Sequence, residues 1–316
     1  LWVLSEMARG TFFSGFPWLL LGHSQTVGPL AGYVPILGTY GVSFIVATVG
    51  SLLFAVVISK KRIVIFATSA ILLILFIGNF LRHAEFTEHS GKAFTVALVQ
   101  GAIPQRIKWE PDLRAWSLDT YSILTEPYWG VDMIVWPETA IPSFESEVLP
   151  FVEQLRSKSL DHGTALLTGI PTRDPETGKY FNSVINFHDR LSQRYDKRHL
   201  VPFGEYLPAK KYLSKLSTVL DVPMSEFSPG LEGSGQLSVL GEIAAVSICY
   251  EVAFSEQMRK ELPNAAFLLN VSNDAWFGRS LAPHQHLQIS RIRAMEFGRE
   301  LVRSTNNGIS VITNHK

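Results

Sequence analysis

The sequence predicts an α/β domain preceded by transmembrane helices. Residues 35–58 and 63–81 contain no charged residue over 24 and 19 positions, and the basic stretch SKKR separates them. From Phe94 onward, short β-branched runs alternate with amphipathic stretches. The first pattern is typical of membrane spans and the second of a sheet covered by helices.

Each uncharged run is long enough to cross a bilayer core, which requires about 20 apolar residues in a helix. Neither run shows a polar face. The alternative is a pair of core helices in a large soluble protein. Lys60, Lys61 and Arg62 lie in the short loop, and short basic loops stay on the cytoplasmic side. We therefore expect the chain after about Arg82 to lie on the opposite side, which is the periplasm in a double-membrane bacterium.

This division predicts two domains. Residues 1–84 form a partial membrane domain, and residues 85–316 form a periplasmic catalytic domain. Because the chain begins inside apolar sequence, we expect further membrane helices before it. We also expect the catalytic domain to continue beyond its last residue.

The second part of the chain is predicted as buried strands separated by helices. The strands are expected at 94–100, 132–138, 164–171, 183–187, 242–251 and 265–274, and the helices at about 111–127, 145–161, 252–262 and 284–304. Several strands end in polar or reactive residues, namely Glu138, Cys249, Asn273 and Asp274. Ligands bind beyond the carboxyl ends of strands in such sheets, so we expect these residues to meet in one cleft.

Cys249 is the only cysteine, and it follows the apolar run AAVSI. One interpretation is a small buried core residue, which is common for free cysteine. The other is a nucleophile, which needs a nearby base and a positive charge that favours the thiolate. Glu138, in VWPETA, would be that base, because a desolvated carboxylate accepts a proton more readily. A helix cap or an edge salt bridge is the alternative for Glu138.

Lys197 lies in the charged stretch YDKRH and is followed by the apolar loop LVPFGEYLP around Glu205. A solvated surface lysine is the ordinary interpretation. An ammonium beside a developing oxyanion would instead contribute strongly in a dry site.

Metal and nucleic-acid sites are not predicted. His284 and His286 are spaced i, i+2, which does not put two ligands on one helical face, and no second cysteine is available. We therefore expect no metal and no cofactor. The chain has 28 basic and 28 acidic residues, so it lacks the basic excess expected of a general nucleic-acid binder.

The motifs VWPETA, YDKRHLVPFGEY and ICYE together resemble the nitrilase superfamily. This resemblance implies a four-layer αββα sandwich with a catalytic triad of Glu138, Lys197 and Cys249. The membrane segments and the stretches GFPWLLLGHSQ, VQGAIPQRIKW, SNDAWFG and RSTNNGIS resemble the apolipoprotein N-acyltransferase family within it.

The resemblance implies a multi-pass enzyme of the bacterial inner membrane. It would move an acyl chain from a phospholipid, with phosphatidylethanolamine as the expected donor, to a thioester on Cys249. The acceptor would be the α-amino group of the diacylglyceryl-cysteine at a lipoprotein N-terminus. Glu205 would support Lys197 and the acceptor amine, Tyr250 and Glu251 would shape the pocket, and Trp109 would guard its entrance.

Two other functions compete with this interpretation. A membrane-tethered amidase or nitrile hydrolase of the same superfamily would share the triad and release an acid to water. A periplasmic binding or scaffold domain with a membrane anchor would leave Cys249 buried and inert.

Overall fold

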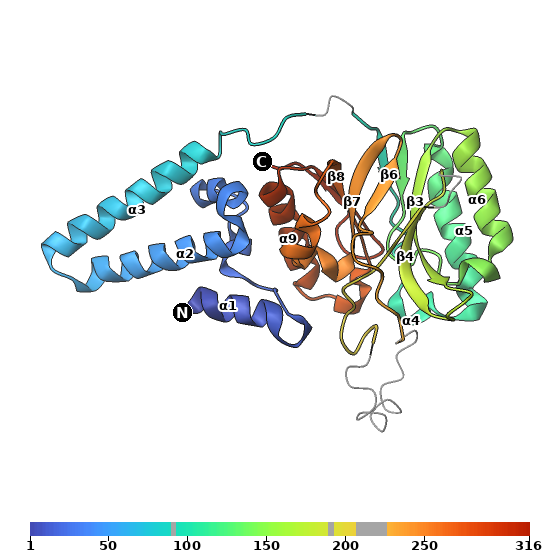
Figure 1. Cartoon of the computed structure of the whole chain (residues 1–316), viewed down its shortest axis with the longest axis horizontal. Helices are drawn as coiled ribbons and strands as arrows, with labels where there is room; N and C mark the ends of the chain where they lie inside the picture. Colours follow the sequence, from blue (N-terminus) through green and yellow to red (C-terminus); the bar gives the residue numbers. More distant parts are fainter. Residues whose placement is uncertain (90–92, 189–192, 207–225) are drawn as a thin grey trace, which may run out of the picture. The chain divides into compact units, whose positions relative to one another are not determined.

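The computed structural model describes residues 1–89, 93–188, 193–206 and 226–316 (Figure 1). The chain divides into two compact units. The first comprises Leu1–Ser90, Gln285–Leu301 and Thr313–Lys316, and the second comprises Gly91–His284 and Val302–Ile312. The first unit also includes two segments from late in the sequence, so the two units do not correspond to one cut in the chain. The boundary expected between residues 84 and 85 remains a prediction.

The first unit contains the two predicted apolar helices. Helix α1 (Trp2–Thr11) comes first, and α2 (Val34–Ile58) and α3 (Lys61–Leu81) then form a hairpin (Figure 1). The segments Pro29–Ile58 and Lys61–Leu81 are both long and apolar enough to cross a membrane. Large apolar side chains point outward along both helices, including Phe54 at 63% exposure and Phe76 at 71%. Such exposure is unfavourable in water and favourable in lipid.

Helix α9 (Ala282–Phe297) contributes to the core of the first unit. Its Ile292 and Met295 pack with Tyr33, Val34 and Val42. The prediction of one helix over 284–304 is wrong at its C-terminal end. Gly298 has a φ of +60°, the left-handed conformation that stops helices, and the buried run Leu301–Thr305 forms strand β9 instead.

The second unit contains a sheet in which parallel and antiparallel strands are mixed. Its order is β1-β2-β3-β4-β5, with β1, β2 and β3 parallel and the last two pairings antiparallel. The strands are β1 (Val96–Leu98), β2 (Met133–Val135), β3 (Ala165–Arg173), β4 (Tyr180–Asn186) and β5 (Arg194–Asp196).

The second sheet has the order β10-β9-β8-β7-β6, and β7 runs parallel to β8. Its remaining strands are β6 (Gln236–Val239), β7 (Glu242–Ile248), β8 (Ala265–Ser272) and β10 (Val311–Thr313). The inner faces of both sheets share one apolar core, in which Val135, Leu167 and Val184 meet Val246 and Leu269. Burying each such side chain contributes roughly 1.5–3 kcal/mol.

Helices cover the outer side of the first sheet. Helices α5 (Arg114–Thr125) and α6 (Leu149–Asp161) lie on the face of β3 and β4 that points away from β7 (Figure 1). Their Tyr121 and Val152 pack with Ile134 and Leu166 of the sheet. Two short α-helices, α4 (Gln105–Lys108) and α8 (Ser255–Arg259), also belong to this unit. The predicted fold class, an α/β sandwich of two sheets with outer helices preceded by apolar helices, is confirmed.

Candidate active site

Glu138 lies just beyond β2 in the first sheet. The turn that carries it is held against β3, since the Gly169 N–H donates to the Pro137 carbonyl at 3.2 Å. A Cβ at Gly169 would lie 2.5 Å from the Pro137 oxygen and 2.7 Å from Glu138 Cα, so only glycine permits this approach. Glu138 is 7% exposed. The local fold therefore removes this carboxylate from water.

Lys197 follows β5 and joins Glu138 to Glu205. Its Nζ lies 3.3 Å from Glu138 Oε1 and 2.9 Å from Glu205 Oε1. Asn182, on β4, donates to the same two carboxylates at 2.8 and 3.0 Å. The second oxygen of Glu205 accepts from the Val201 N–H at 2.8 Å. These contacts fix both carboxylates around one buried ammonium.

The charge of Lys197 is secured by its neighbours. Burial alone would lower the pKa of Lys197, but the carboxylates of Glu205 and Glu138 outweigh burial and raise the pKa above its ordinary value. Lys197 is therefore a fixed positive charge throughout the physiological pH range.

Cys249 lies at the end of β7, on the second sheet. Its φ is +53°, a conformation that is costly for a residue with a Cβ, and it begins the short 3-10 helix Cys249–Ala253. Asn270, on β8, donates to the Cys249 carbonyl at 3.4 Å and to Ser247 Oγ at 2.9 Å. The sharp turn places Cys249 at the strand end, where it packs against the edge of the apolar core between the sheets.

The Cys249 thiol is protonated at rest. Burial and the negative charge of Glu138 raise its pKa to about 12, while the ammonium of Lys197 opposes them. Asp274 also raises this pKa, and a hydrogen bond with Ser272 lowers it. A nucleophile in this state requires a base that accepts its proton as it attacks.

Near the thiol, a buried ion pair joins strand β9 to the residues that follow β8 in the second sheet. Arg303 Nη2, on β9, lies 2.9 Å from Asp274 Oδ2, and both side chains are fully buried. Ser272 Oγ donates to Asp274 Oδ1 at 2.8 Å. Arg303 also donates to Asn270 Oδ1. The Asp274 carboxylate therefore accepts hydrogen bonds from both Arg303 and Ser272.

Glu251 ties the thiol turn to the loop after β5. Its Oε2 accepts from the Ile248 N–H at 2.8 Å and from the Tyr195 hydroxyl at 2.7 Å. Its Oε1 accepts from the backbone N–H groups of Arg198 and His199 at 2.8 and 2.9 Å. These contacts hold the residue before Cys249 and the residue after Lys197 on one carboxylate. Glu251 is fully buried, and its predicted role in shaping the pocket remains a prediction.

Tyr250 and Trp109 are both half-buried. The Tyr250 ring packs edge-on against Phe254, with ring centroids 5.0 Å apart. Trp109 directly follows α4. Their predicted roles at the pocket and its entrance remain predictions.

Lys108 is a candidate that the sequence interpretation missed. It is 3% exposed, and its Nζ donates to the backbone carbonyl of Glu138 at 3.0 Å. Burial lowers the pKa of Lys108 to about 8, against the opposing charges of Glu138 and Cys249. Its position next to Trp109 in the stretch IKWEP was the only sequence signal.

The structure brings four of the predicted residues of the second unit together. Glu138, Lys197 and Glu205 are joined by direct contacts. Cys249 is coupled to Glu138 and Lys197 through their opposite effects on its pKa. The catalytic roles of these residues, and the expected absence of a metal or cofactor, remain predictions.

Two families match this sequence. Residues 95–315, most of the chain, match the carbon-nitrogen hydrolase family. Residues 1–52 match the N-terminal domain of apolipoprotein N-acyltransferase. The two matches follow each other along the chain in the order of the two predicted domains. Together with the two apolar helices, they indicate a membrane-associated protein.

The curated relatives are similar along the whole chain. Apolipoprotein N-acyltransferase of Methylococcus capsulatus is 37% identical over 98% of this chain and 62% of its own length. The proteins of the same name from Coxiella burnetii and Nitrosomonas europaea are 41% and 39% identical over 98% and 100% of this chain, and over 64% and 63% of their own lengths. The chain thus spans a little under two thirds of these relatives. The chain belongs to the carbon-nitrogen hydrolase family, and its curated relatives within that family are named apolipoprotein N-acyltransferase.

Proposed function

We propose that this chain carries the catalytic centre of an apolipoprotein N-acyltransferase. It moves an acyl chain from a phospholipid to the α-amino group of the diacylglyceryl-cysteine of a lipoprotein. The observation that carries the proposal is the buried cluster of Glu138, Lys197 and Glu205 coupled to Cys249, in one chain with two helices that are apolar enough to cross a membrane.

The first half-reaction forms a thioester. Cys249 Sγ attacks the carbonyl carbon of the sn-1 ester, and Glu138 accepts the thiol proton during the attack, because the raised pKa leaves almost no free thiolate. The ester C–O bond then breaks, and the lysophospholipid leaves as an alcohol with the proton that Glu138 returns. Phosphatidylethanolamine is the proposed donor.

The second half-reaction forms the amide. The lipoprotein α-amine attacks the thioester carbon, the C–N bond forms and the C–S bond breaks. Glu138 accepts the amine proton and returns it to the Cys249 sulfur. Two substrates thus use one site in turn, which is a ping-pong scheme.

Two buried cations support the tetrahedral intermediates in this scheme. Lys197 remains charged, and together with the Tyr250 N–H it stabilises the oxyanion. Lys108 holds the Glu138 turn through the backbone carbonyl and adds positive charge next to the thiol and carboxylate. Glu205 fixes Lys197, and in this proposal it also binds the incoming amine.

The proposed location follows from the basic loop between α2 and α3. With Lys60, Lys61 and Arg62 in the cytoplasm, the second unit lies in the periplasm, on a multi-pass protein of the inner membrane. An acyl donor in the same membrane reaches the enzyme without crossing water.

The test is a search for the covalent intermediate. The full-length membrane protein is incubated with phosphatidylethanolamine carrying a labelled sn-1 chain, without acceptor, and intact-protein mass spectrometry detects acylation. Variants Cys249→Ala and Glu138→Gln are run alongside, with Glu256→Gln on the exposed face of α8 as the matched control.

A hydroxylamine-labile adduct that is lost in both site variants and kept in the control is the expected result. Continuous release of labelled fatty acid without an adduct would assign the chain to the hydrolases instead. If folded protein gives neither an adduct nor release of fatty acid, Cys249 is a core residue and not a nucleophile.

A further inference from the structure

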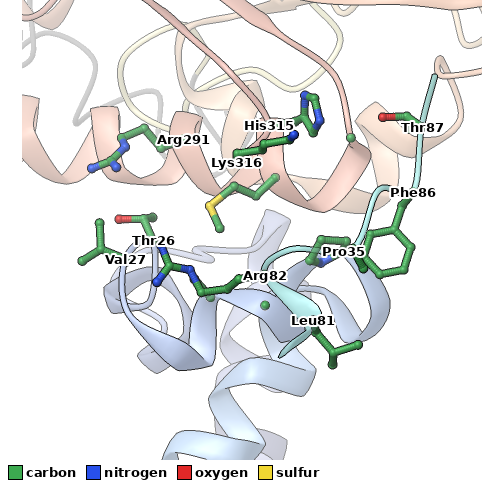
Figure 2. A pocket seen from close by; sticks show the side chains of 15 residues that line it. Thr26, Val27, Pro35, Leu81, Arg82, Phe86, Thr87, Arg291, His315 and Lys316 are labelled. Atoms are coloured by element: carbon green, nitrogen blue, oxygen red, sulfur yellow. The ribbon is translucent and has the colours of Figure 1, made fainter. Parts of the chain in front are cut away.

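The first unit contains a pocket that shares no residue with the cluster around Cys249. It is a cavity of about 150 Å³ between the end of α3, the segment before α2, and α9. Figure 2 shows Arg82 at the end of α3 and Arg291 on α9, with Thr26 between them in this view.

The charge around this pocket is of one sign. Its lining includes Arg82, Arg291, His315 and Lys316 and contains no acidic residue. Lys316 is paired with Glu85, which lies outside the lining. The side chains of Arg82 and Arg291 have neither an ion pair nor a hydrogen bond with any residue that the structure describes. Two unpaired guanidinium groups on one cavity favour an anion between them.

A buried hydroxyl points to the same ligand chemistry. Thr26 lines the pocket and is 5% exposed. Its Oγ1 accepts a hydrogen bond from Gln288 Nε2 at 2.8 Å, so its own proton remains available to donate. Hydrogen-bond donors that lack an acceptor among the described residues are therefore concentrated around this pocket.

The other side of the pocket is apolar and continuous with the membrane-spanning helix. Leu81, the last residue of α3, and Phe86 belong to the lining. Earlier in the last turn of α3, Ile77 and Phe80 are 39% and 69% exposed. A ligand bound here contacts cationic side chains at one end and an apolar helix surface at the other. A membrane phospholipid has that combination of groups, and a free phosphate ion does not.

We propose that this pocket binds the phosphate group of a membrane phospholipid. Arg82 and Arg291 donate to the phosphate oxygens, Thr26 donates a further hydrogen bond, and the acyl chains lie along α3. The proposal requires α2 and α3 to lie in a membrane, and it does not depend on acyl transfer at Cys249.

The experiment is lipid titration of the full-length protein followed by native mass spectrometry. All proteins carry Cys249→Ala, which separates binding from acyl chemistry. The probe is dioleoyl phosphatidylethanolamine, and sn-glycero-3-phosphoethanolamine is its soluble counterpart without acyl chains. The double variant Arg82→Gln/Arg291→Gln is compared with Arg173→Gln/Arg259→Gln, which removes the same charge from exposed positions of the second unit.

The expected result is at least about a tenfold loss of affinity for one bound lipid in the first double variant, because charge-assisted hydrogen bonds are lost. The second double variant should bind like the parent, and Arg82→Lys/Arg291→Lys should retain part of the affinity. Three results would overturn the proposal: equal losses in both Gln pairs, unchanged binding in both, or a soluble compound that binds as tightly as the lipid.

Discussion

Replacing Glu138 by glutamine is expected to change the reactivity of Cys249 in two opposite directions. Acyl transfer should be lost, because the thiol no longer has a base. Simple alkylation by iodoacetamide should accelerate, because the negative charge that raises the pKa of the thiol is gone.

The size of the effect follows from the thiol pKa. With a pKa of about 12, the thiolate fraction at pH 8 is about 10⁻⁴, whereas a thiol at its ordinary value of 9.0 would be about one tenth ionised. Burial is the larger cause and persists in the variant, so only the share due to Glu138 is recovered. Each unit by which the pKa falls raises the thiolate fraction about tenfold, and because a less basic thiolate is also less nucleophilic, the labelling rate rises about three- to fourfold. Lys197→Met should act in the opposite sense, since it removes the charge that lowers the pKa.

The assay is the pH dependence of iodoacetamide labelling, followed by intact-protein mass spectrometry between pH 7 and pH 10. Cys249 is the only cysteine, so every alkylation event reports on this thiol. Glu256→Gln on α8 is the matched control, and thermal unfolding confirms that each variant is folded. Slower labelling of Glu138→Gln than of the parent would refute the electrostatic reasoning.

Three further predictions concern other parts of the chain. Lys108→Met should lower kcat for thioester formation. In the parent, activity should fall as pH rises through about 8, because the Lys108 ammonium deprotonates, and the variant should lack this fall. The kcat–pH profile measures both effects. Arg303→Met should cost about 3–5 kcal/mol of stability, because it leaves a buried carboxylate unpaired, and an unchanged melting temperature would contradict this. In a Cys249→Ala background, Lys179→Cys should react with a membrane-impermeant maleimide in spheroplasts, while Lys61→Cys should react only after permeabilisation; the reverse pattern would invert the topology.

The sequence was sufficient to predict the second unit's fold class because its strands are buried and rich in β-branched residues. Strands β1, β2, β7 and β8 fall inside predicted runs, and β3 extends two residues beyond its predicted end at residue 171. Strand β9 was missed because its sequence, LVRST, contains three polar residues and gives no strand pattern, and Gly298 alone marks the break. Strands β5 and β10 have only three residues each, too few for a periodic pattern.

The candidate site residues were predictable where a reactive side chain follows the end of a strand. Glu138 and Cys249 each follow an apolar run, so their positions at strand ends could be inferred. Lys108 could not be inferred in this way. It lies on a four-residue helix among other charged residues, and only folding shows that it is buried against the Glu138 carbonyl. Asn182 was missed for a similar reason, since a polar residue within a strand gives no sign of its partners.

Glu138 and Lys197 extend from one sheet, and Cys249 extends from the other. The thickness of the apolar layer between the sheets therefore sets the separation of the proposed base and the proposed nucleophile. A cavity made deep in that layer, for example by Leu269→Ala, would let the sheets settle closer and would move the reacting groups without touching them. In the proposed mechanism, the catalytic rate therefore depends on the packing of this layer. Turnover should decline on heating before the protein unfolds, as the layer loosens.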